Sequence, residues 1–93
     1  MTEQEILNLN DPHQSFWYCY YINKDANINA HQDIIINSNS IHYCYLFAKD
    51  IKSSNKELLF EKLLKYKDLD YIKAFYDNVN FNKSKYETLL LFI

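Results

Sequence analysis

The side chains best suited to metal binding or nucleophilic catalysis are two cysteines and three histidines: Cys19, Cys44, His13, His31 and His42. Metal ligands usually occur as close pairs, such as Cys-x-x-Cys or His-x-x-x-His, because ligands on one turn converge on one ion. Neither spacing occurs in this chain. A Cys–His nucleophile pair that uses His42 stays open, but there is no glycine for the usual oxyanion-binding loop. We therefore expect no catalytic residues, no metal and no cofactor.

Paired carboxylates are the other candidates for chemistry, and they have simpler explanations. Asp68 and Asp70 stand where a helix is predicted to begin, and Glu57 and Glu61 share one helix face. At such positions carboxylates cap helices, interact with the helix dipole, or form ion pairs four residues apart, as Glu61 does with Lys65 in this prediction. We expect all four to be structural.

Composition indicates one compact helical domain. The chain has 93 residues, of which 48% are hydrophobic and 17% aromatic, with no glycine and one proline. Tight hairpins that need positive φ at glycine are therefore disfavoured, and helices joined by polar turns fit better. The formal charge is −2, and no apolar run approaches the ~20 residues that span a bilayer. We expect a cytoplasmic protein with reduced thiols.

Capping signals and apolar spacing predict the helices that would position these side chains. The predicted helices are 2–9, 15–23, 28–37, 41–50, 58–64, 69–78 and 83–93. Their predicted caps include Asp11 before Pro12, Asn39 or Ser40, Ser54 with Glu57 as a capping box, Asp68 and Asn82. The run 34–36 could also form a buried strand, but its length and context favour helix.

A repeated segment organises these helices. Residues 18–25 recur at 43–50 and, more loosely, at 71–78, with spacings of about 25 and then 28 residues. Repeats of this length are typical of solenoids. We predict an all-α fold in a single domain, residues 1–93, with a short N-terminal helix and three stacked hairpins at about 16–40, 41–68 and 69–93. Such a stack favours a binding surface over an active site.

Alignment of the units predicts the core. One column is apolar in every unit and should be buried: Ile22, Phe47 and Phe75. A second column keeps a tyrosine, which we expect to pack between neighbouring helices: Tyr18, Tyr43 and Tyr71. Cys19 and Cys44 share a third column and should pack as small apolar side chains.

Columns that change from aromatic to charged must tolerate water and predict a partner-binding surface. Trp17 and His42 align with Asp70, and Tyr20 and Tyr45 align with a lysine. Clustered exposed aromatics are typical of interface hot spots. We therefore predict that Trp17, Tyr20, His42 and Tyr45 bind another protein. In the alternative interpretation the N-terminal helix folds over this surface.

Two further features suggest other partners. Nine of the ten lysines lie from Lys49 onward. A basic stretch with one aromatic could face nucleic acid or an acidic partner, although arginine, the usual base reader, is absent. Its residues are Lys52, Lys56, Lys62, Lys65, Tyr66 and Lys67. The chain also ends in an apolar run, and Leu91, Phe92 and Ile93 are candidates for homodimer formation.

The middle unit, with residues 43–51, then Ser54 and Asn55 and the helix 58–64, resembles the short helical repeats of many bacterial and phage proteins. Those repeats read as Tyr, three residues, Phe-Ala, one residue and Asp-Ile, followed by an Asn-led helix. They look like miniature HEAT-type solenoids, and the resemblance implies a protein-interaction scaffold without catalytic residues. In size and style the chain is also similar to small phage inhibitors of host machinery, anti-CRISPR proteins included.

Overall fold

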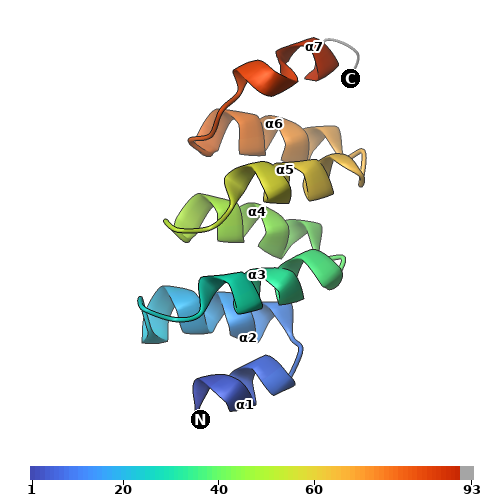
Figure 1. Ribbon diagram of the computed structural model, residues 1–93. Helices are drawn as coiled ribbons and strands as arrows, with labels where there is room; N and C mark the ends of the chain where they lie inside the picture. Colours follow the sequence, from blue (N-terminus) through green and yellow to red (C-terminus); the bar gives the residue numbers. More distant parts are fainter. Residues whose placement is uncertain (91–93) are drawn as a thin grey trace.

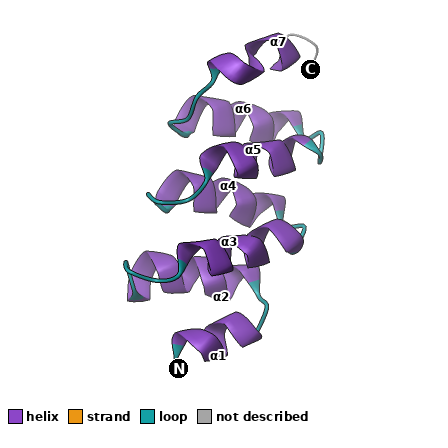
Figure 2. Cartoon of the chain, in the orientation of Figure 1, coloured by secondary structure: helices purple, strands orange, loops and turns teal. Residues whose placement is uncertain are grey.

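The computed structural model describes residues 1–90, which form an elongated stack of helices measuring 45 × 21 × 16 Å (Figure 1). This confirms the predicted all-α fold. The elements are α1 (Glu3–Asn8), α2 (Pro12–Trp17), a π-helical turn η1 (Tyr18–Ile22), α3 (Ile28–Asn37), α4 (Ile41–Asp50), α5 (Lys56–Leu64), α6 (Leu69–Asn78), a 3₁₀ turn η2 (Ser84–Tyr86) and α7 (Glu87–Leu90). Figure 2 shows only helices and connecting turns over this range, and none of these helices could cross a bilayer.

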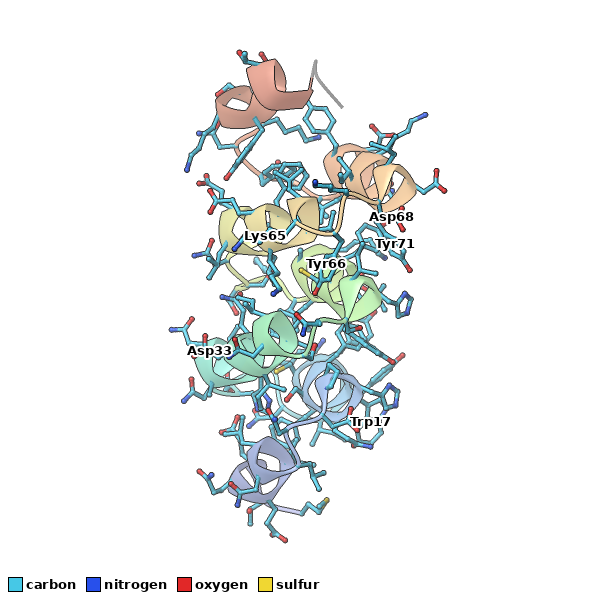
Figure 3. All side chains as sticks on the ribbon, turned by 90° about the vertical axis from the view of Figure 1, so that its right-hand side faces the viewer. Trp17, Asp33, Lys65, Tyr66, Asp68 and Tyr71 are labelled. Atoms are coloured by element: carbon cyan, nitrogen blue, oxygen red, sulfur yellow. The ribbon has the colours of Figure 1, made fainter. Side chains whose placement is uncertain are left out.

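The helices lie in two layers. Helices α2, α4 and α6 stack on one side, and α3 and α5 stack on the other, with α1 and α7 at the two ends (Figures 1 and 3). The core lies between the layers, where Phe47, Leu59, Phe60, Leu63 and Phe75 are completely buried. Burial of each such side chain contributes about 1.5–3 kcal/mol, so the contact between layers holds the fold together.

One turn design recurs before each helix of the first layer. The side chains of Asp11, Ser40 and Asp68 cap α2, α4 and α6, and these caps are 29 and 28 residues apart. The residue before each cap has positive φ: Asn10 at 51°, Asn39 at 61° and Lys67 at 56°. Asparagine tolerates this left-handed conformation, whereas a lysine adopts it at a cost of about 1–2 kcal/mol.

Two predicted helix starts are wrong by a few residues. Helix α5 is capped by Asn55, which accepts from the amide of Leu58, whereas the Ser54 hydroxyl donates to the Ile51 carbonyl at 2.7 Å. The predicted capping box between Ser54 and Glu57 is therefore absent, because Ser54 closes the preceding turn instead. The final helix begins as a 3₁₀ turn after Lys83 and becomes α-helical only at Glu87.

The predicted burial of Ile22 is wrong, and the π-helical turn explains why. The amide of Asn23 bonds to the carbonyl of Tyr18, five residues back, at 3.0 Å. This turn takes in one residue more than an α-helical turn and rotates the following side chains out of register. Ile22 is consequently 55% exposed.

The 25-residue alignment of the first unit is also displaced by one helical turn, because the caps of the first two units, Asp11 and Ser40, are 29 residues apart. Counted from its cap, Tyr18 is the seventh residue, as are Phe47 and Phe75, and all three are buried. Tyr43 and Tyr71 are the third residues after their caps and are only partly buried. Tyr18 thus belongs with the buried phenylalanines. The prediction that it shares a column with Tyr43 and Tyr71 is wrong.

The strained turn before α6 gives a stability prediction. Lys67→Gly should raise the free energy of unfolding by about 0.5–1 kcal/mol, because glycine adopts positive φ without a Cβ clash. Lys65→Gly is the matched control. Because Lys65 has an ordinary φ of −65°, this substitution should lower the free energy of unfolding by about as much. Urea denaturation of the three proteins measures both effects, and a destabilised Lys67→Gly would contradict the strain.

Candidate functional site

The side of the molecule formed by α2, η1, α4 and α6 carries a continuous set of aromatic rings, which we call the aromatic surface. Its residues are His13, Phe16, Trp17, Tyr20, Tyr21, His42, Tyr43, Tyr45 and Tyr71. Figure 3 shows Trp17 and Tyr71 on this side, opposite Asp33 and Lys65. Successive ring centroids are no more than 6.4 Å apart, so the rings support one another across three helices.

A histidine–tyrosine hydrogen bond is repeated between successive helices of this layer. His13 Nδ1 bonds to the Tyr43 hydroxyl, and His42 Nδ1 lies 3.2 Å from the Tyr71 hydroxyl. Both histidines are the second residue after a cap, and both tyrosines are the third. The repeat of the fold therefore produces a repeated surface contact.

The predicted partner-binding residues all lie on the aromatic surface. Trp17 is 43% exposed and His42 is exposed, while Tyr20 and Tyr45 are partly buried. The Tyr45 hydroxyl accepts a bond of 3.2 Å from Asn78 Nδ2. The alternative, in which the N-terminal helix covers this surface, is wrong for Trp17 and His42, because both remain open to solvent.

Helix α1 instead packs on the end of the stack through a buried polar chain. His31 and Ser15 are completely buried, and His31 Nδ1 lies 2.9 Å from Ser15 Oγ. On the other side of the ring, His31 Nε2 lies 3.0 Å from Glu3 Oε2, which also accepts from the Asn27 amide at 2.8 Å. Glu3 therefore attaches α1 to the first turn of α3.

A serine, a histidine and a glutamate hydrogen-bonded in a row have the composition of a hydrolase triad, but here their geometry serves packing. Ser15 has no exposed surface for a substrate to reach, and its hydroxyl contacts Nδ1 while the carboxylate contacts Nε2, the reverse of the usual order. Sequence reasoning missed this chain. The available signal was Ser15, which stands four residues after its cap, where the other units place the apolar Cys44 and Ile72.

Burial makes the two thiols poor nucleophiles. It raises the pKa of both Cys19 and Cys44 to about 12, because a thiolate loses its hydration inside the protein. The Cys44 thiol donates to the Leu59 carbonyl at 3.2 Å. Over residues 1–90 no three histidine, cysteine or acidic side chains come close enough to hold a metal ion.

The predicted lysine face is divided between the two ends of the helices. Lys52 and Lys56 lie at the start of α5, where Lys56 Nζ donates to the carbonyls of Ile51 and Lys52 at 3.2 Å each. Burial lowers the pKa of Lys56. The remaining members lie in the last turn of α5 or beyond its end, about 9 Å or more along the helix axis from Lys56: Lys62, which donates to Asn39, and Lys65, Tyr66 and Lys67.

Asp68 and Glu61 make structural contacts, although the partner of Glu61 differs from the prediction. Asp68 caps α6, as expected. Glu61 pairs with Lys85 at 3.5 Å, and not with Lys65. It also accepts a hydrogen bond from the Tyr86 hydroxyl at 2.8 Å. These contacts attach η2 to α5. The proposed dimer residues Leu91, Phe92 and Ile93 lie outside the described residues, so self-association stays a prediction.

Removal of the Glu3 carboxylate should loosen α1. Glu3→Ala leaves the Nε2 of His31 and the Asn27 amide without their acceptor, and we expect a loss of about 1–3 kcal/mol in the free energy of unfolding. Gln4→Ala, in the same helix but exposed, should change it by less than about 0.5 kcal/mol. Amide hydrogen exchange should show the loss in α1. Equal stability of wild type and Glu3→Ala would refute this anchoring role.

The thiols should be inert in the folded protein. At pH 8 a group with a pKa of about 12 is ionised in only about one molecule in 10⁴. Ellman's reagent should therefore react slowly with the native protein at pH 8 and rapidly in guanidinium chloride, where both thiols regain hydration. Rapid reaction of the native protein would show an accessible, activated cysteine.

Comparison with known proteins assigns no family. No family model matches the chain, and no curated protein and no solved structure shows significant similarity to it. The resemblance to short helical repeats therefore rests on the sequence pattern alone, and the function must be argued from the residues described above.

Proposed function

We propose that this chain is a non-catalytic protein-interaction module that binds another protein stoichiometrically through the aromatic surface. The supporting observation is the gathering of tyrosine, tryptophan and histidine side chains on one side of α2, α4 and α6, with Trp17 and Tyr21 43% and 64% exposed. Tryptophan and tyrosine dominate interface hot spots, since each buries a large area while its polar atom keeps a hydrogen bond.

The aromatic surface is also held in place before any partner arrives. Tyr43 and Tyr71 are each bonded to a histidine of the neighbouring helix, and Tyr45 is bonded to Asn78. Side chains that are already ordered lose less entropy on binding, which for a mobile side chain costs about 0.5–1.5 kcal/mol. Preorganisation thus favours recognition by this side of the molecule.

Occlusion is the mechanism that such a surface supports. A small rigid stack that covers a functional patch on an enzyme inhibits it without chemistry. An inhibitor of a host defence enzyme, such as a CRISPR effector, is the specific role that we propose, and it rests on the size and style of the chain. The nucleic-acid alternative has weaker support, since its lysines lie at opposite ends of α5 and Lys56 is engaged by backbone carbonyls.

Loss of the exposed rings should abolish partner binding and leave the fold intact. Trp17→Ala with Tyr21→Ala removes the two most exposed rings of α2 and η1, and we expect at least a hundredfold weaker capture of the partner, about 2.7 kcal/mol. The bait is the full chain in nuclease-treated lysate of the source cells, followed by measurement of the complex mass.

The matched control is Leu58→Ala with Leu69→Ala, which removes two exposed apolar side chains outside the aromatic surface. Circular dichroism should be unchanged in both variants. Undiminished capture by the aromatic variant would refute the proposed surface. Capture only when nucleic acid is left intact would favour the alternative function.

A further inference from the structure

A pocket beside the aromatic surface has a different character from the rings around it. It has a volume of about 530 Å³ and is lined by residues from η1 to the start of α3 and from the α4–α5 connection. The connections that precede α3 and α5 both lie on the left-hand side of Figure 1. Its lining residues are Cys19, Tyr20, Lys24, Ile28, Asp50, Ile51, Lys52 and Ser53. Sites for small ligands and anchor side chains commonly have about this volume.

The lining of the pocket combines apolar and charged side chains. Tyr20, Ile28 and Ile51 are apolar members, and Cys19 is almost completely buried. Lys24 Nζ lies 5.1 Å from the centroid of the Tyr20 ring. A guest side chain that enters would therefore meet apolar side chains with an ammonium group beside them.

Two lysines, Lys24 and Lys52, and one aspartate, Asp50, are the charged residues that line the pocket. Asp25 follows Lys24 in the chain, and Lys49 and Lys56 stand just outside the lining segment 50–53. Asp50 is already paired with Lys49 at 3.0 Å. Among residues 1–90 no carboxylate lies within 4 Å of the ammonium group of Lys24 or Lys52.

Lys56 does not line the pocket but bonds to the segment that does. Its ammonium group donates to the carbonyls of Ile51 and Lys52 and to the Ser54 hydroxyl at 3.0 Å. These bonds satisfy carbonyls that follow α4, which would otherwise repel an anion at this edge. The carbonyls of Ile51 and Lys52 are thus engaged, and the Lys52 side chain is exposed.

We propose that this pocket binds an acidic peptide segment of the partner protein, with one large apolar side chain in the pocket and flanking carboxylates on Lys24 and Lys52. The inference deepens the proposed function and rests on it. Tyr20 joins the two regions, since its ring stacks on Phe16 of the aromatic surface at 5.5 Å. One bound segment could therefore run from the aromatic rings into the pocket.

Panning a displayed library of random short linear peptides against the full chain tests this without a known partner. The selected peptides should be enriched in aspartate and glutamate beside a leucine, phenylalanine or tryptophan. Their binding should weaken as salt is raised, because the charges of the exposed lysines are screened. Lys24→Glu with Lys52→Glu should reduce their affinity about tenfold or more.

Two controls separate charge from shape. Lys65→Glu with Lys67→Glu places the same charge change at the opposite edge of the stack and should leave affinity unchanged. Ser53→Trp blocks the pocket without altering charge and should also reduce binding. All the substituted lysines and Ser53 are exposed. Circular dichroism checks that each variant folds.

Other outcomes would overturn the inference: no enrichment, enrichment of basic or uncharged peptides, or binding indifferent to Lys24, Lys52 and Ser53. Peptides that depend on Trp17 and Tyr21 but not on the pocket would overturn it while leaving the proposed function standing. Dependence on the pocket alone would support the inference and count against the aromatic surface as the binding site.

Discussion

Contact between the two helix layers is the constraint on which the rest of this structure depends. Each helix of the first layer begins at a cap, and the residues four and seven positions later face the second layer. Once those positions are buried, helical geometry decides which of the remaining side chains face solvent. The aromatic surface is therefore the outer side of the same helices whose inner side forms the core.

Each end of the stack combines a buried side chain, Ile6 or Tyr86, with a carboxylate contact. At one end, Glu3 holds α1 through His31 and Asn27. At the other, Glu61 holds η2 through Tyr86 and Lys85. A solenoid unit that lacks a neighbour on one side cannot bury both of its faces, so terminal elements need other attachments. Here a directional carboxylate contact takes that role at each end.

The π-helical turn connects the fold to the proposed function. By adding one residue to the end of the first helix, η1 leaves Tyr21 and Ile22 in solvent, whereas Tyr18, at its start, stays in the core. It also brings Tyr20 to the border between the aromatic surface and the pocket. Such turns are frequent at functional sites, since they redirect side chains without ending a helix.

Local signals in the sequence determined the elements and their caps. Asp11, Ser40 and Asp68 could be found because a capping side chain acts on amides two or three residues away. The all-α fold followed from the same patterns. The repeat columns indicated a surface position for Trp17 but left open whether the N-terminal helix covers it, which the structure decides in favour of exposure. Tertiary structure alone decided the burial of His31 against Glu3 and the pocket, because each depends on residues that are distant in sequence. A repeat of tyrosines 25 residues apart looked regular, but packing placed Tyr18 with Phe47 and Phe75.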